Sequence, residues 1–381
     1  MKLRSHTFAA ALSLWALLVA VCSAQNQTPP QRPTDDVSRL TAECNAGKPD
    51  SCMKLGLLYR EGQQVTKDDK RAAEFFARAC DAGYAVACTK LGMLYSLGEG
   101  VTKDEKRAAE LYRRACDTGD AAGCTGLGFQ YATGGGVPRD EKRASELFSR
   151  ACDAGDAGGC SGLALSYASG GGVPADDNRA AELYRRACDL GSASACYELA
   201  WWYEEGRGVP KDMKTALDLY QRSCEAGYAR ACCSWGFRYE RGLGVPKSES
   251  RAIELYRRAC DGGDGDGCNR VGWMYAQGQA VTKDEKRAVE FYQRACDMGH
   301  GTGCVNLAIA YMDGRGVAKD DKRAAQIFAL ACDTGYAAAC YDLATMYEAG
   351  RGVPKDRARA SALYKTACDQ GIAEACSAMR K

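Results

Sequence analysis

The sequence predicts an all-α protein built from tandem copies of one small helix–turn–helix unit. Two cysteines eight residues apart recur ten times along the 381 residues, always with a period of 36 residues. Between successive pairs, apolar and small residues follow the three- and four-residue spacing of a helix face. A glycine-rich break divides each complete unit. Such a fixed period indicates a repeat array, because an array grows by stacking and needs no single large core.

Residues 1–24 have the features of a secretory signal peptide. Two basic residues are followed by an apolar run at 8–21 and then by small residues before Gln25. The run is short for a membrane span, so we expect cleavage and a secreted or periplasmic protein. A lipoprotein signal that acylates Cys22 is the alternative, although Val21 is bulky for the position before such a cysteine.

A leader and a capping helix precede the complete units. Residues 25–33 are rich in Gln, Pro and Asn, which predicts a short flexible segment. Residues 34–44 are amphipathic and align with the second half of the later units. We therefore expect a lone capping helix there, and a repeat region that covers residues 34–381.

The unit at 85–117 illustrates the two helices. Its first helix is predicted over 85–97, and residues 98–104 break it. Asp104 is a suitable N-cap for a second helix over 105–117, because its carboxylate can accept from free amides of the first turn. Gly119 can end that helix with a positive φ.

Several positions are nearly uniform among the nine complete units. Tyrosine stands near the end of every first helix, as at Tyr95, and Gly or Ala stands three residues before it, as at Gly92. The second helix always carries an alanine, as at Ala108, with an aromatic residue four positions later, as at Tyr112. Small residues let two helix backbones approach, and the rings fill the space between hairpins.

The segment from Leu91 to Ala115 carries a family resemblance. It reads Leu-Gly-x-x-Tyr-x-x-Gly-x-Gly-Val-x-x-Asp-x-x-x-Ala-x-x-x-Tyr-x-x-Ala and resembles a Sel1-like repeat, a relative of the tetratricopeptide repeat. With the cysteine pair added, the units are similar to the secreted Helicobacter cysteine-rich (Hcp) proteins. The resemblance implies an α/α superhelical solenoid of nine hairpins with flanking capping helices and one disulfide per repeat. It also implies either penicillin binding with weak β-lactamase activity, or an adaptor or host-interacting role.

Structural disulfides fit the cysteines better than zinc binding or redox exchange. Zinc would need four ligands close together, whereas the pairs are separate and the chain has 2 histidines. The Cys-x-x-Cys spacing of redox sites does not occur. A total of 22 cysteines also suits an oxidising compartment. The predicted pairs are Cys44 with Cys52, Cys80 with Cys88, Cys116 with Cys124, Cys152 with Cys160, Cys188 with Cys196, Cys224 with Cys232, Cys260 with Cys268, Cys296 with Cys304, Cys332 with Cys340, and Cys368 with Cys376.

Cys233 does not fit this pairing. Removal of residues 1–24 takes away Cys22 and leaves 21 of the 22 cysteines, so one has no intramolecular partner. Cys232 keeps the period, which makes Cys233 the expected free thiol. It is either a shielded thiol or a residue that pairs with another chain.

The charge balance and the known motifs exclude several functions. Without residues 1–24 the chain has 49 basic residues (51 less Lys2 and Arg4) against 49 acidic ones, so we expect no non-specific binding of nucleic acid. Ser51-Cys52-Met53-Lys54 spells the Ser-x-x-Lys motif of serine β-lactamases, but Lys-Thr-Gly and Ser-Asp-Asn are missing. His300 lies in a predicted turn. We assign no catalytic residue, metal, cofactor or further membrane span.

A variable face of the first helices is the predicted binding surface. One column contains Lys54, Lys90, Gly126, Gly162, Glu198, Ser234, Arg270, Asn306 and Asp342, and the next contains Leu58, Leu94, Gln130, Ser166, Trp202, Arg238, Met274, Ala310 and Met346. Solenoids bind extended ligands along such a face. We predict Trp202, Glu205, Arg238 and Arg270 as ligand-binding residues, with a scattered exposed Trp202 as the alternative, and we expect Trp235 to be packed.

Three functions remain open at this point. The first is a secreted or periplasmic scaffold that binds a protein, peptide or glycan, including a peptidoglycan-related ligand, on its concave face. The second is a β-lactam-binding hydrolase, which only the Hcp resemblance suggests. The third is an envelope stress or assembly factor without a small-molecule ligand.

Overall fold

The computed structural model describes residues 35–379. The predicted signal peptide (1–24), the leader (25–33) and Cys22 lie outside the described residues. Within residues 35–379 the chain forms twenty α-helices and no strand, so the all-α prediction is confirmed. None of these helices combines the length and the hydropathy that a membrane crossing needs.

Eighteen of these helices form nine hairpins, each made of two 13-residue helices. The first helices are α3 (Pro49–Glu61), α5 (Ala85–Leu97), α7 (Ala121–Thr133), α9 (Ala157–Ser169), α11 (Ala193–Glu205), α13 (Ala229–Arg241), α15 (Gly265–Gln277), α17 (Gly301–Asp313) and α19 (Ala337–Ala349). The second helices are α4 (Asp69–Asp81), α6 (Glu105–Asp117), α8 (Glu141–Asp153), α10 (Asp177–Asp189), α12 (Met213–Glu225), α14 (Glu249–Asp261), α16 (Glu285–Asp297), α18 (Asp321–Asp333) and α20 (Arg357–Asp369). Two further helices flank them, α2 (Asp35–Asn45) and α21 (Ala373–Ala378).

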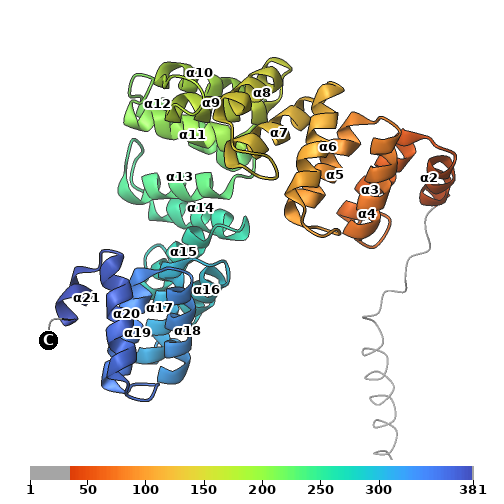
Figure 1. The fold of residues 1–381 in the computed structure, drawn as a ribbon. Coiled ribbons are helices and arrows are strands. Elements are labelled where there is room, and N and C mark those ends of the chain that lie inside the picture. The colour runs from red at the N-terminus through yellow and green to blue at the C-terminus, as the bar shows by residue number, and fades with distance from the viewer. Residues whose placement is uncertain (1–34, 380–381) are drawn as a thin grey trace, which may run out of the picture. The chain divides into compact units, whose positions relative to one another are not determined.

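The described chain divides into two compact units. The first contains residues 35–166 and 171–174, and the second contains residues 167–170 and 175–379. In each unit, successive hairpins stack in chain order (Figure 1). Each unit has its own hydrophobic core, which in the second unit includes Tyr220 and Tyr256.

Local capping chemistry sets the helix ends where the sequence predicted them. Asp104 accepts a hydrogen bond from the backbone N–H of Arg107 (2.9 Å) and thereby starts α6. Gly98 ends α5 in the left-handed conformation, with φ +76°, and Gly119 follows α6 with φ +97°. An aspartate, or Ser248 in α14, caps each of the other second helices in the same way, which explains why these helices share one length.

Close packing inside each hairpin explains the uniform small residue of the first helix. A Cβ atom on Gly92 would lie 2.9 Å from the ring of Tyr112, and one on Gly56 would lie 2.4 Å from the ring of Phe76. The aromatic ring of the second helix therefore occupies the space that a side chain at the glycine would need. This is the packing that the sequence predicted.

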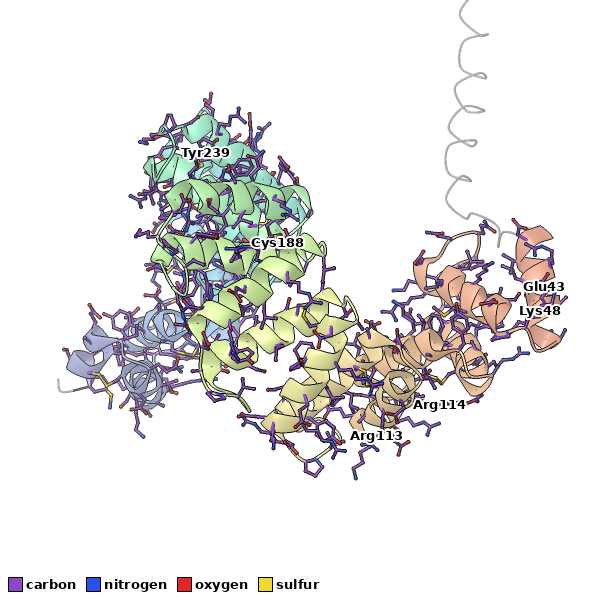
Figure 2. The ribbon with its side chains drawn as sticks, turned by 90° about the horizontal axis from the view of Figure 1, so that it is seen from above. Glu43, Lys48, Arg113, Arg114, Cys188 and Tyr239 are labelled. Atoms are coloured by element: carbon purple, nitrogen blue, oxygen red, sulfur yellow. A yellow bond between two sulfur atoms is a disulfide. The ribbon has the colours of Figure 1, made fainter. Side chains whose placement is uncertain are left out.

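Disulfides form at all ten predicted positions, eight between consecutive hairpins and one at each flanking helix, so the prediction of one per repeat is confirmed. Each links the last turn of a second helix, or of α2, to the first turn of the following helix, with Cα atoms 4.4–4.8 Å apart. Closing so short a loop contributes roughly 2–3 kcal/mol in the chain-entropy picture. The observed bridges join Cys44 to Cys52, Cys80 to Cys88, Cys116 to Cys124, Cys152 to Cys160, Cys188 to Cys196, Cys224 to Cys232, Cys260 to Cys268, Cys296 to Cys304, Cys332 to Cys340, and Cys368 to Cys376. The bridge at Cys188 is one of those visible among the side chains in Figure 2.

A column of arginines in the second helices adds a polar link between repeats. Arg114, labelled in Figure 2, donates to the carbonyl oxygen of Cys80 (2.6 Å) and pairs with Asp81 (3.2 Å). The last carbonyls of a helix have no partner inside it, and the guanidinium supplies one. The sequence analysis did not identify this link. Equivalent bonds run from Arg78 to Cys44, from Arg150 to Cys116 and from Arg222 to Cys188.

Candidate functional site

Trp202 is a core residue, and its prediction as a surface recognition residue is corrected. Its side chain is 2% exposed. The indole packs edge-on against Tyr184, with ring centroids 5.5 Å apart, and the guanidinium of Arg207 lies 4.4 Å from the centroid on another side. A partner could not reach this ring without opening the hairpin. The alternative of a scattered exposed aromatic residue is equally wrong.

The variable column that contains Trp202 is mostly interior. Leu94 and Met274 are 0% exposed and Met346 is 1% exposed. Variation among the copies therefore reflects how each repeat packs within its own part of the array. It does not mark a solvent-facing groove along this column.

Glu205 and Arg238 are not brought together. Glu205 is exposed, whereas Arg238 forms an ion pair with the neighbouring Glu204. The side chains of Arg238 and Glu204 are only 12% and 13% exposed, and Tyr220 donates to the same carboxylate oxygen (2.9 Å). Burial raises the pKa of Tyr220, and the adjacent Glu204 raises it further while Arg238 opposes the change. The phenol therefore stays a neutral donor.

Arg270 belongs to a second polar cluster. It donates to Asp266 (3.0 Å) and lies 3.5 Å from Glu240, which in turn accepts from the hydroxyl of Tyr256 (2.5 Å). Trp202, Glu205, Arg238 and Arg270 therefore do not form one site. Arg238 and Arg270 each neutralise a glutamate of the preceding repeat.

Cys233 is the free cysteine of the described residues, and it is buried. Its thiol donates to Asp266 (3.3 Å). Burial, with a further contribution from Asp266, raises the pKa of the Cys233 thiol well above its usual range. A buried, protonated thiol is a poor nucleophile, which favours the shielded-thiol alternative over pairing with another chain.

Three tyrosines share one arrangement, which we call the tyrosine cap. In each, the hydroxyl donates to a glutamate sixteen residues earlier in the first helix of the same hairpin. The pairs are Tyr220 with Glu204 (2.9 Å), Tyr256 with Glu240 (2.5 Å) and Tyr364 with Glu348 (2.8 Å). The sequence signal for this cap is the recurrence of glutamate sixteen residues before tyrosine, which the sequence analysis did not consider.

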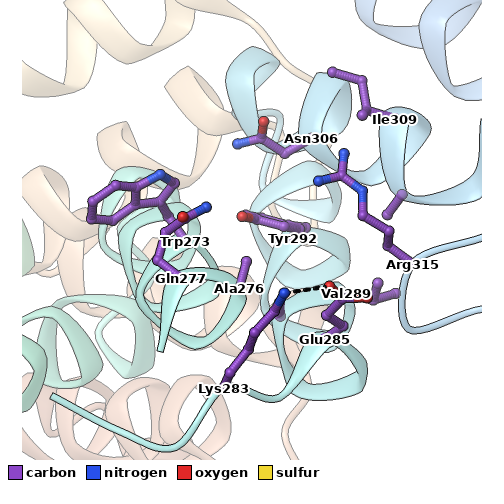
Figure 3. A pocket seen from close by; sticks show the side chains of 12 residues that line it. Trp273, Ala276, Gln277, Lys283, Glu285, Val289, Tyr292, Asn306, Ile309 and Arg315 are labelled. Carbon is purple, nitrogen blue, oxygen red and sulfur yellow. Dashed lines mark ion pairs between the residues drawn. The ribbon is translucent and has the colours of Figure 1, made fainter. Parts of the chain in front are cut away.

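Tyr292 has no such cap and instead lines a cavity of about 450 Å³. The cavity lies among α15, α16, α17 and the loop after α17, and Figure 3 shows Trp273, Tyr292, Asn306 and Arg315 around it. Tyr292 is 7% exposed, and its hydroxyl makes no hydrogen bond to any residue between 35 and 379. Burial raises its pKa to about 12, with Arg315 opposing the change, so at neutral pH the hydroxyl is a donor.

The cavity wall joins an exposed aromatic ring to charged groups. Trp273 is 38% exposed at the rim. Arg315 is half-exposed and pairs with Asp313 (2.9 Å), while Lys283 pairs with Glu285 (3.0 Å). Lys283 and Glu285 offset each other on the wall, whereas the acid that pairs with Arg315, Asp313, does not line the cavity. The sequence analysis did not identify this cavity.

Trp235 is packed as predicted, with 8% of its side chain exposed. His300 caps the start of α17, where its Nδ1 atom accepts from the backbone N–H of Gly303 (3.1 Å). Across residues 35–379, no three His, Cys, Asp or Glu side chains gather as metal ligands would.

The Ser-x-x-Lys sequence does not assemble as a serine–lysine pair. Ser51 is 4% exposed, and its hydroxyl donates to Glu43 (2.6 Å), which is labelled in Figure 2. That hydrogen bond is the main reason that the pKa of Glu43 is lowered. Lys54 is exposed. A nucleophilic serine would instead need its base within hydrogen-bonding distance.

Comparison with known proteins agrees with this architecture of disulfide-linked helical hairpins. The Sel1 repeat family model matches nine segments, at residues 49–84, 85–120, 121–156, 157–192, 193–228, 229–264, 265–300, 302–336 and 337–372. The chain therefore belongs to the Sel1 repeat family. No curated protein matches the chain.

Several solved structures also resemble this chain. A Sel1 repeat protein from Oxalobacter formigenes is 26% identical, with a TM-score of 0.55 over 64% of this chain and 96% of that one. The protective antigen c5321 of uropathogenic Escherichia coli is 25% identical, with a TM-score of 0.47 over 90% and 89%. Cysteine rich protein B of Helicobacter pylori is 29% identical, with a TM-score of 0.30 over 36% of this chain and 98% of that one.

Proposed function

We propose that this protein is an extracytoplasmic Sel1-repeat scaffold that binds a peptide segment of a partner protein at the Trp273 cavity. The observation that carries the proposal is the cavity itself. Its volume of about 450 Å³ is within the range of ligand sites, and the exposed indole of Trp273, the hydroxyl of Tyr292 and the guanidinium of Arg315 border it. Aromatic and arginine side chains dominate binding energy at many protein interfaces.

The disulfides support a location outside the cytoplasm. Ten of them in one chain require an oxidising compartment to form and persist. The predicted signal peptide at 1–24 agrees with such a location, as either a secreted or a periplasmic protein. A protein with a lipid attached at Cys22 would also lie outside the cytoplasm.

A peptide fits the cavity better than the alternative ligands. The wall has apolar parts at Val289 and Ile309 next to the charged and hydrogen-bonding groups, as a peptide with mixed side chains requires. The β-lactamase alternative gains no support from Ser51, because its hydroxyl is bound to Glu43 and buried. A glycan remains an outcome that a direct binding test would reveal.

The test is selection of N-acetylated hexapeptides from a random library on the purified, oxidised protein, followed by titration of the selected peptides. We expect Trp273→Ala to weaken binding about tenfold or more. Trp201→Ala is the matched control, because Trp201 stands at the same position of α11, is 39% exposed and lines none of this cavity. Failure to select any peptide, or equal losses in the two variants, would contradict the proposal.

A further inference from the structure

The tyrosine cap places a carboxylate at one position of the hairpin. In the repeats at 193–228 and 229–264, the carboxylates of Glu204 and Glu240 accept from the tyrosine of the second helix. An arginine from the next first helix neutralises each of them, Arg238 for Glu204 and Arg270 for Glu240. The arrangement is thus one carboxylate held between a phenol donor and a guanidinium.

In the repeat at 265–300, the carboxylate is missing while its two kinds of partner are present. Ala276 stands sixteen residues before Tyr292, where the three capped repeats have Glu204, Glu240 and Glu348. The space that a glutamate side chain would fill is part of the cavity, since both Ala276 and Tyr292 line it. The hydroxyl of Tyr292 therefore has no carboxylate partner within the hairpin and is left as a donor on the cavity wall, available to a ligand.

Arg315 differs from the arginines at the same loop position of other repeats. Arg207 is held by Asp177 (2.8 Å) and by a backbone carbonyl (2.9 Å), and Arg351 is held in the same way by Asp321 and a backbone carbonyl (2.8 Å each). The equivalent acid for Arg315 is Glu285, but Glu285 pairs with Lys283 instead, and among the described residues Arg315 pairs only with the half-exposed Asp313 (2.9 Å). The guanidinium of Arg315 extends toward Tyr292 and Asn306 (Figure 3).

We propose that this cavity binds a carboxylate of the peptide ligand in the place that Glu204, Glu240 and Glu348 occupy in the capped repeats. Tyr292 donates to the carboxylate and Arg315 neutralises it, while Trp273, Val289 and Ile309 contact an adjacent apolar side chain. This inference rests on the proposed function and assigns its ligand class. The carboxylate comes either from the C-terminus of the peptide or from an Asp or Glu side chain.

Three pools of N-acetylated hexapeptides distinguish these sources by equilibrium dialysis against the oxidised protein. The first pool has a free C-terminal carboxylate and no Asp or Glu, the second is amidated and carries one Glu, and the third is amidated without acidic residues. We expect retention of the first or second pool at least about tenfold above the third, as charge-assisted hydrogen bonds would give. Equal retention of the third pool, still lost in Trp273→Ala, would overturn the carboxylate inference alone. Retention of no pool would overturn the proposed function as well.

Ala276→Glu converts this repeat into a capped one and is the decisive variant. The introduced carboxylate should bind Tyr292, repel an acidic ligand and reduce retention of the acidic pools at least about tenfold. The melting temperature should equal or exceed that of the wild type, because three repeats of the same chain already carry this glutamate. Undiminished retention by a folded Ala276→Glu protein would overturn the inference.

Ala132→Glu is the matched control for the added charge. Ala132 is the equivalent residue of α7, but the aromatic residue sixteen positions later is Phe148, which has no hydroxyl. We expect unchanged retention of all pools by Ala132→Glu.

Arg315→Gln changes a half-exposed position and should not affect folding. It should also reduce retention of the acidic pools about tenfold and remove the salt dependence of that retention. Wild-type affinity in Arg315→Gln would contradict the inference even if Ala276→Glu failed to fold.

Discussion

The hairpins α11–α12 and α15–α16 have the same backbone plan but different interiors at one position. In α11–α12, Glu204 fills the space beside the second-helix tyrosine and is bound by Tyr220 and Arg238. In α15–α16, Ala276 leaves that space open as part of a cavity of about 450 Å³. The repeat fold therefore accepts either a glutamate that fills this space or an alanine that leaves it empty. The empty space can accommodate a ligand.

The comparison also separates two kinds of charged pair. Arg238 and Glu204 are 12% and 13% exposed, so removal of either leaves a largely desolvated charge. Lys283 and Glu285, at the cavity, are 60% and 34% exposed and mostly screened by water. Stability should thus depend on the filled repeat much more than on the open one.

The largest expected effect follows from Glu204→Ala. Because this change leaves Arg238 buried without its acid and Tyr220 without its acceptor, it should reduce the free energy of unfolding by about 3 kcal/mol. Glu285→Ala removes an exposed pair and should cost less than about 0.5 kcal/mol. Guanidinium unfolding followed by circular dichroism measures both. Similar losses of unfolding free energy in the two variants would contradict the view that the Glu204 ion pair stabilises the fold more than the Glu285 ion pair does.

A smaller effect is expected from the matched pair Tyr256→Phe and Tyr292→Phe. Tyr256→Phe deletes the hydrogen bond to Glu240 and should cost about 1–2 kcal/mol of unfolding free energy. Tyr292→Phe deletes no hydrogen bond to the described residues and should change stability by less than about 0.5 kcal/mol. Both should fold, since the chain itself has phenylalanine at this position in Phe76, Phe148 and Phe328. A large loss in Tyr292→Phe would show that the hydroxyl is already satisfied without a ligand.

The fold could be predicted from the sequence because its determinants are local. The predicted helices at 85–97 and 105–117 coincide with α5 and α6, since the capping Asp104 and the positive-φ Gly98 and Gly119 lie at the helix ends themselves. Ten repetitions of one cysteine pair then fix how each hairpin is joined to the next.

The site could not be predicted in the same way. Trp202 stands in a variable column, which suggested exposure, but the stacking of repeats decides burial and places it in the core at 2% exposed. Contacts between Glu204 and Tyr220 span sixteen residues and two helices, so helical periodicity does not reveal them. The absence of glutamate at Ala276 becomes significant only once Glu204, Glu240 and Glu348 show how a glutamate at this position binds the tyrosine.

The smallest effect concerns Asp342, which stands at the position of Asn306 in the next repeat. In the described part of the chain, neither a tyrosine hydroxyl nor an arginine guanidinium binds its carboxylate. It is half-buried in α19, and its carboxylate makes no hydrogen bond within residues 35–379, so burial raises its pKa from 3.8 to about 6. Between pH 4 and 6 the folded protein therefore binds more protons than the unfolded chain. Stability attributable to this group is full below about pH 4, falls as the pH rises through 6 and stays reduced above it.

Asp342→Asn should remove that pH dependence, and Asn306 shows that asparagine fits this position of the helix. After allowance for partial exposure, we expect the variant to gain about 1 kcal/mol at pH 7.5 and nothing at pH 4, because the protonated aspartic acid resembles the amide. Melting temperatures of wild type and variant at pH 4, 5, 6 and 7.5 measure the difference. A difference in melting temperature that does not change with pH would mean that the ionised Asp342 is already stabilised by its surroundings. A half-buried carboxylate in this fold would then not need a tyrosine and an arginine such as those that bind Glu204.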